Sequence, residues 1–252
     1  MRSWRRKARP ALPDDWRDVV ARRVAHWALL DDAERDRLGE LMTDLVMTKR
    51  WEAARGFVLT DEVRTVIAAQ AALLVLGLDA GCYHDIGSII VHPTTMRFGR
   101  THTGPAGTVG HGPRPVVGQA NHRGPVVIAW DAARAGARHP ERGRDVVLHE
   151  FAHKLDMLDD VVDGTPPLPD AEARRRWFRV CTAEMARLRA GEGSPLLRTY
   201  AATNPAEFFA VATEAFFDRP VELHADVADL YDVLRDFYRQ DPAARARRAA
   251  GG

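Results

Sequence analysis

Cysteine is scarce in this chain of 252 residues. Cys82 and Cys181 are its 2 cysteines, and they lie too far apart to form a CxxC pair. A disulfide framework or a cysteine-based zinc site needs more thiols at closer spacing, so both are excluded. Isolated thiols are typical of free, buried cysteines in a reducing compartment, and we therefore expect a cytoplasmic protein.

A long apolar run is also missing. The longest one, residues 66–78, contains Gln70 and is shorter than the roughly 20 residues that span a bilayer. The N-terminus begins with charged residues and continues with Pro10 and Pro13 instead of an apolar stretch, which argues against a secretory signal. We therefore expect no interaction with a membrane.

An excess of one charge is lacking as well, since 36 Lys+Arg oppose 35 Asp+Glu. This balance argues against a protein that coats nucleic acid directly. The basic residues gather at the two ends, while the body between them is acidic. An apolar share of 46% can fill one core. We predict a basic disordered tail at residues 1–11, a single domain at 12–240 and a disordered tail at 241–252.

Hydrophobic periodicity predicts helices on both sides of a short β region. The β-branched runs Ile86–His92 and Pro125–Trp130 predict strands, and Phe57–Leu59 predicts a shorter one. Residues 97–123 have no usable period, and we interpret them as a long loop or a ragged hairpin. The fold class is α+β: a helical part at 12–80, then a catalytic part at 81–240 with a small mixed or antiparallel sheet. The expected helices lie within residues 14–50, 61–78, 142–158, 170–190, 204–217 and 225–240.

The sharpest motif is His149-Glu150-Phe151-Ala152-His153, inside an apolar helical stretch. Residues four apart share one helix face, so both imidazoles can reach one ion. A catalytic zinc site needs such donors, a third protein ligand and an open position for water. Glu150 can take the proton of that water. Two histidines on a helix can also be core or surface residues, so the motif alone is not decisive.

Glu207 has two readings from the residues alone. Asn204 and Pro205 predict a helix start, and Glu207 follows the cap by three residues, as a capping-box acid would. The helix it begins is apolar, however, and a carboxylate that points inward needs a partner such as a metal ion. We favour Glu207 as the third ligand.

Three neighbouring residues have two readings each. Glu214, seven residues after Glu207, either supports a metal ligand from outside or forms an ion pair with an arginine. Asp156 has two similar interpretations, and we slightly favour the one in which it orients a ligand imidazole. Tyr200 either packs or donates a hydrogen bond to the oxyanion of a tetrahedral intermediate.

Three blocks of sequence resemble the Mlc titration factor A family of bacterial zinc-dependent peptidases. They are HEFAHKLD at residues 149–156, YAATNPAEFFAVATEAFF at 200–217 and GPVVIAWD at 124–131. The resemblance extends over roughly residues 12–242 and implies a zincin-like, gluzincin-related fold. It also implies one Zn²⁺ per chain on His149, His153 and Glu207, with Glu150 as general base.

The resemblance bears on two further residues. Tyr200 precedes Glu207 by seven residues, a spacing similar to that in the catalytic domain of anthrax lethal factor, which implies that Tyr200 assists the transition state. In the Mlc titration factor A family, a histidine upstream of the GPVV block is associated with the metal site. His111 is the nearest match, although its segment is a residue shorter than the family pattern. It is either an additional metal contact or a solvated loop residue.

We therefore predict a zinc metallopeptidase, aminopeptidase-like, that acts on a peptide or protein substrate. An extended substrate could pair with the strand Pro125–Trp130. The alternative, implied by the family name, is a regulatory protein that sequesters a DNA-binding glucose repressor, with peptidase activity secondary. An open protease is hazardous to its cell, so we also expect the loop Thr101–Arg123 to gate the site.

Overall fold

The computed structural model describes residues 11–54, 56–94 and 124–251. The predicted N-terminal tail, apart from its last residue, and the predicted gating loop lie outside the described residues. No helix in the described part of the chain combines the length and apolar character needed to cross a membrane. The α-helices are α1 (Trp16–Arg23), α2 (Asp32–Thr48), α3 (Asp61–Leu74), α4 (Trp130–Arg138), α5 (Val146–Asp156), α6 (Ala171–Ala190), α7 (Pro205–Asp218), α8 (Pro220–Asp226), α9 (Ala228–Tyr238) and α10 (Pro242–Gly251).

Three short strands form a parallel sheet in the order β1-β2-β3. They are β1 (Arg50–Ala53), β2 (Ser88–His92) and β3 (Val126–Ala129). The predicted mixed or antiparallel sheet is therefore wrong. A parallel pair needs a crossover connection, and α3 provides one between β1 and β2. β2 and β3 are also parallel, so they are not the two strands of a hairpin, which was one of the two forms predicted for the segment between them. Residues 57–59 form no strand, and β1 lies earlier, at the end of the stretch predicted as helix.

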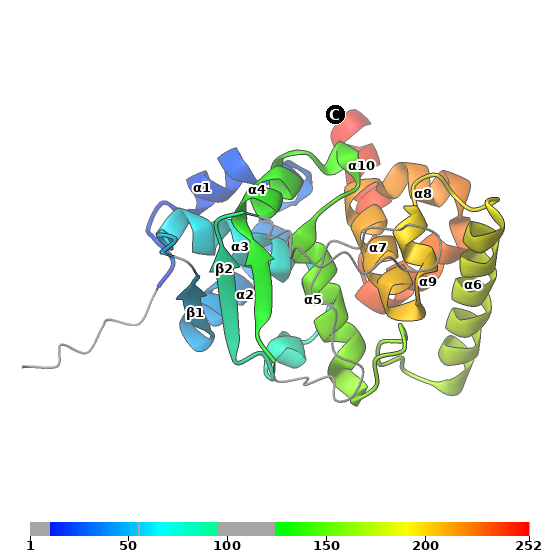
Figure 1. Cartoon of the computed structure of the whole chain (residues 1–252). Coiled ribbons are helices and arrows are strands. Elements are labelled where there is room, and N and C mark those ends of the chain that lie inside the picture. Colours follow the sequence, from blue (N-terminus) through cyan, green and yellow to red (C-terminus); the bar gives the residue numbers. More distant parts are fainter. Residues whose placement is uncertain (1–10, 55, 95–123, 252) are drawn as a thin grey trace, which may run out of the picture.

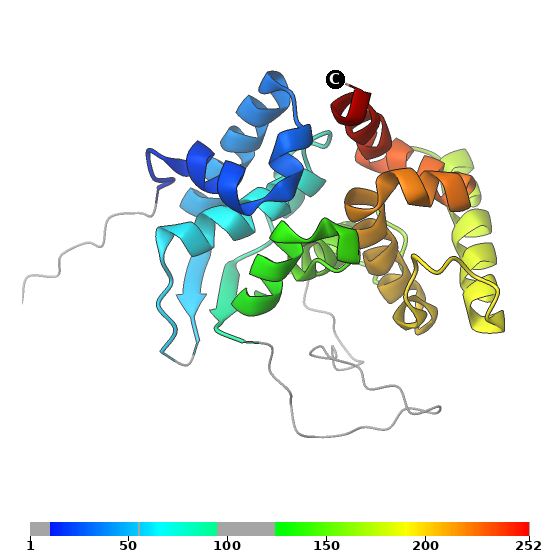
Figure 2. The same ribbon diagram turned by 90° about the horizontal axis from the view of Figure 1, so that it is seen from above.

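The N-terminal helices form their own part of the core beside the sheet. α3 packs against α1 and α2, and its residues from Thr65 to Leu74 are all buried. Thr60 caps α3 as predicted, since its side chain accepts a hydrogen bond from the Val63 backbone N–H at 3.3 Å. Figure 2 shows α1 to α3 in blue and cyan on one side of the molecule and the orange and red C-terminal helices on the other.

Helix α5 lies between these two groups of helices (Figure 1) and contacts α3, β3 and α7. One face of α5 is wholly buried, and so is α7 from Phe208 to its end. Two helices with buried apolar faces hold each other rigidly, because cores pack at the density of organic crystals. Side chains that α5 and α7 direct at one another therefore have well-defined positions.

The C-terminal residues form α10, so the disordered tail predicted at 241–252 is wrong for its described part. Alanine and arginine are good helix formers. α10 also has tertiary contacts, because Arg245 is buried and its guanidinium lies 2.6 Å from the carboxylate of Glu34 in α2. This ion pair and the contact of α10 with α8 anchor a segment whose composition alone indicated disorder.

Candidate metal centre

Local hydrogen bonds set the start of α5 and thereby the direction of its side chains. The carboxylate of Asp145 accepts from the backbone N–H groups of Val147 at 2.8 Å and Leu148 at 3.1 Å. His149 and His153 follow one turn apart on the face that looks toward α7. Their ring centroids lie 4.8 Å apart, and their Nε2 atoms lie 3.2 Å apart. Both imidazoles are thus presented from one turn of helix.

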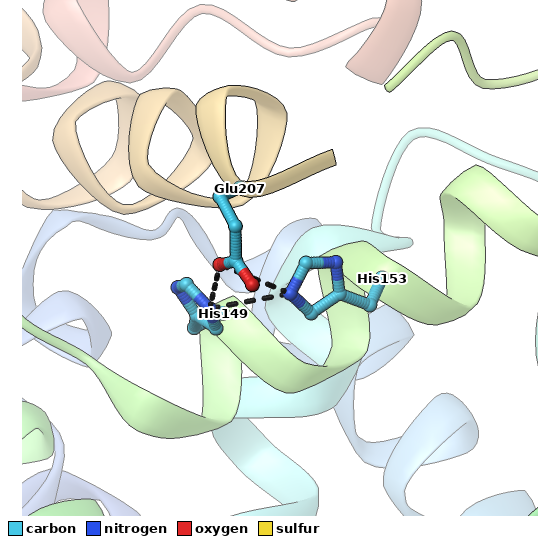
Figure 3. A group of neighbouring side chains, drawn as sticks. All are labelled: His149, His153 and Glu207. Carbon is cyan, nitrogen blue, oxygen red and sulfur yellow. Dashed lines mark hydrogen bonds and ion pairs between the residues drawn. The ribbon is translucent and has the colours of Figure 1, made fainter. Parts of the chain in front are cut away.

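Helix α7 brings Glu207 to the same point (Figure 3). Asn204 caps α7 as predicted, because its side chain accepts from the Glu207 backbone N–H at 3.0 Å. The Glu207 carboxylate reaches the imidazoles, with Oε2 at 3.1 Å from Nε2 of His149 and 3.6 Å from Nε2 of His153. One ligand atom from each of the three residues lies within 4.8 Å of the others. Two nitrogens and one carboxylate oxygen are the donor set of a catalytic zinc site with an open position.

The electrostatics of this cluster favour a positive charge at its centre. Burial disfavours the imidazolium of His149, yet hydrogen bonds to the carboxylates of Glu207 and Glu214 raise its pKa to about 10. Burial alone would raise the pKa of Glu207, yet hydrogen bonds from both histidines hold this pKa well below the usual range. A proton and a metal ion compete for the same lone pairs, so a site that holds a proton this firmly suits a cation.

Behind His149, Glu214 of α7 completes the orientation of the ring. Its Oε1 lies 2.8 Å from Nδ1 of His149, and its Oε2 accepts from the Asp145 backbone N–H at 2.8 Å. Arg198 also forms an ion pair with Oε1. Both readings of Glu214 from the sequence are therefore present together: it contacts a candidate ligand, and it pairs with an arginine.

Glu150 and Tyr200 flank the same cluster. Burial raises the pKa of Glu150 above its usual value, against the opposing effect of the two histidines. Tyr200 lies in a short 3-10 helix, η5 (Thr199–Ala202), and its ring centroid is 6.2 Å from that of His149. Burial, the charge of Glu207 and a hydrogen bond to that carboxylate raise the pKa of Tyr200, which keeps the phenol protonated.

The other two predicted residues are not brought to the cluster in this way. Asp156 is fully buried at the end of α5, and its carboxylate lies beside the backbone N–H groups of Gly164 and Thr165. It forms no hydrogen bond with a side chain of the described residues. The expected hydrogen bond to a ligand imidazole is therefore absent. Burial raises the pKa of Asp156 to about 6. His111 and the loop Thr101–Arg123 lie outside the described residues.

Sequence reasoning did not identify Asp145 or Arg198. Asp145 stands directly before the apolar run that starts α5, so a cap signal was present in the sequence. Arg198 has no such signal, since it is one of many arginines in this chain and lies 16 residues from its partner Glu214. Only the packing of η5 against α7 brings this pair together.

Comparison with known protein families defines the class of this protein. The family model of glucose-regulated metallo-peptidase M90 matches residues 1–239, and the chain belongs to this family. A metallopeptidase family implies a metal ion, and His149, His153 and Glu207 are a group that could bind one.

Individual relatives match almost the whole chain. Mlc titration factor A of Serratia proteamaculans is 32% identical over 92% of this chain and 89% of its own length. Mlc titration factor A of Edwardsiella ictaluri is 32% identical over 96% of this chain and 94% of its own. The protein slr2042 of Synechocystis is 36% identical over 95% and 89%. The resemblance predicted from the sequence blocks is thus confirmed.

Proposed function

We propose that this chain is a zinc-dependent metallopeptidase, aminopeptidase-like, with one zinc ion per chain bound by His149, His153 and Glu207. The observation that carries the proposal is the convergence of two imidazole nitrogens and one carboxylate oxygen within 4.8 Å. In the neutral imidazole of His149, the contact of Nδ1 with Glu214 places the proton on Nδ1 and the lone pair on Nε2, where an ion would bind. These residues fit zinc, because the donors are of the preferred types and three in number.

The bound zinc would supply Lewis acidity, which acidifies a water molecule and polarises the substrate carbonyl. Glu150 then accepts a proton from the attacking water and donates it to the leaving amine. Its raised pKa brings it closer to neutral pH, where a group can both accept and donate. Tyr200 stays protonated and donates a hydrogen bond to the developing oxyanion.

Strand β3 is the proposed support for the substrate. Among the described strands it lies at one edge of the sheet, with β2 on its other side. It is also attached to the helix of the histidines, because the Lys154 ammonium donates to the Gly124 carbonyl at 2.9 Å. An extended peptide that adds to this edge would lie along α5.

The decisive experiment combines metal analysis with one substitution. We expect the purified chain to contain about one zinc per molecule, and Glu150→Gln to retain it. The same variant should lose roughly 100-fold or more of the hydrolysis of aminoacyl 4-nitroanilides, because its amide cannot accept the proton. Asp159→Asn, an exposed acid after α5, is the matched control and should keep full activity. Full turnover by Glu150→Gln would refute the peptidase assignment.

The names of the relatives favour a second function, the sequestration of an Mlc-like repressor. Two proteins called Mlc titration factor A share 32% of aligned residues with this chain over most of its length. In this case the partner is a DNA-binding repressor and hydrolysis is secondary. Purification of the tagged Glu150→Gln variant from its own cells tests the idea, with mass spectrometry of the retained proteins. A stoichiometric transcription factor would favour sequestration, and its absence would favour the peptidase alone.

A further inference from the structure

The carboxylate of Glu214 is buried beside the candidate metal centre. Its side chain is 3% exposed, and a buried carboxylate is stable only when it is paired and hydrogen-bonded. Three chain segments supply its partners. His149 of α5 and Arg198 at the start of η5 share Oε1, and the Asp145 backbone N–H ahead of α5 donates to Oε2.

This arrangement determines which nitrogen of His149 faces the metal ligands. The Glu214 carboxylate accepts at Nδ1, so in the neutral imidazole the proton lies on Nδ1 and the lone pair on Nε2. Nε2 points to Glu207 and His153, where an ion would bind. Anything that keeps Glu214 in place therefore keeps His149 ready for the metal.

Arg198 connects this inner carboxylate to Tyr200. It stands two residues before Tyr200, and its carbonyl accepts the first hydrogen bond of η5 from the Ala201 backbone N–H at 2.8 Å. The opposite end of η5 has a separate anchor, since Nε of Arg189 in α6 donates to the Ala202 carbonyl at 3.1 Å. The guanidinium of Arg198 is thus the contact that ties η5 to Glu214.

The neighbourhood of Glu214 is acidic, which makes this guanidinium important. Asp145 and Asp218 are both buried nearby, and burial and the charge of Asp218, with a smaller contribution from Glu214, raise the pKa of Asp145 to about 8. Without Arg198, the buried Glu214 carboxylate would lose its guanidinium partner, and this cost would favour its movement away from Nδ1 of His149. Arg198 therefore pairs with the buried Glu214 carboxylate and also connects it to η5.

We propose that Arg198 is a positioning residue that couples the two halves of the active site: through Glu214 it orients the metal ligand His149, and through η5 it places Tyr200. The inference rests on the proposed function and adds to it one shared support for the metal and the oxyanion donor. Loss of that support should disturb both halves together.

The test uses Arg198→Ala and Arg198→Lys in the full chain, with Arg189→Ala as a control that loosens η5 without touching Glu214. Zinc affinity is measured by competition with a chromophoric chelator. The position of Tyr200 is followed by fluorine NMR of protein labelled with 3-fluorotyrosine. The chain has 4 tyrosines, and Tyr200→Phe assigns the relevant signal. Circular dichroism checks folding, and Arg198→Gln replaces Arg198→Ala should the latter not fold.

We expect Arg198→Ala to lower zinc affinity roughly 10-fold to 100-fold, the usual cost of losing an outer partner of a ligand, and Arg189→Ala to change it less than about twofold. Arg198→Ala should also shift the Tyr200 signal, and Arg198→Lys should lie between wild type and Arg198→Ala in both measurements. A change in one measurement without the other, or in neither, overturns the coupling. A wild-type chain that binds no zinc would instead contradict the proposed function.

Discussion

The two sides of the His149 ring differ in what surrounds them. On the Nε2 side, the side chains of Glu207 and His153 are 16% and 18% exposed, and their donor atoms converge on Nε2 of His149. On the Nδ1 side, Glu214 is 3% exposed, and an imidazole, a guanidinium and a backbone N–H satisfy it. The outer side is thus suited to receive an ion and a substrate, while the inner side holds the ring still.

The largest expected effect on zinc affinity comes from removing a ligand on the Nε2 side of the His149 ring. His153→Ala removes one of three donors. Zinc affinity should therefore fall by more than about 100-fold, the largest usual loss when a residue that only hydrogen-bonds a ligand is removed. Dialysis followed by elemental analysis measures the retained metal. His139→Ala is a matched control, since the His139 side chain is 44% exposed and contacts the carboxylate of Glu141 at 3.0 Å. Equal zinc retention by both variants would show that His153 is not a ligand.

The pH dependence of zinc affinity tests the protonation state of His149. The pKa of His149 is about 10 without an ion, so the ring is protonated at pH 7 and zinc must displace that proton. Affinity should therefore rise between pH 6 and 8 by about tenfold per unit, with release of about one proton per zinc. Calorimetry in two buffers of different ionisation enthalpy measures this release. Binding that is independent of pH would contradict the protonated state of His149.

The same shift in the pKa of His149 acts on the stability of the metal-free chain. A histidine whose pKa is raised on folding stabilises the protein fully below its unfolded value of about 6.5. That contribution is lost as the pH rises through about 10. Stabilisation by zinc should grow over the same interval, and thermal unfolding with and without zinc compares the two.

The smallest effect on zinc should come from Asp156→Asn, because Asp156 makes no hydrogen bond to His153. Affinity should stay within about twofold of wild type, well inside the cost of losing an outer partner. Stability should respond instead, because burial raises the pKa of Asp156 to about 6 and ionisation above that pH destabilises the fold. At pH 8 the variant should gain roughly 1–2 kcal/mol over wild type, and below about pH 4 none. A loss of zinc affinity near that expected for Arg198→Ala would restore the role predicted from the sequence.

Much of the local structure was predictable. The caps Thr60 and Asn204 are where the residue types indicated, and β2 and β3 lie inside the runs predicted as strands. These features depend on neighbours a few residues away in the chain. The direction of the sheet was not predictable in this way, because it depends on how α3 crosses from one strand to the next.

The sequence by itself determined the pair of histidines and their common helix face, since a spacing of four on a helix brings both rings to one side. It also indicated Glu207 and Tyr200 as candidates. Only the tertiary structure decided that Glu214 contacts His149, that Arg198 joins Glu214 to η5, and that Asp156 forms no hydrogen bond with a ligand imidazole. These contacts join segments many residues apart, so the packing of α5, α7 and η5 selects the partners, and residue type and spacing alone cannot.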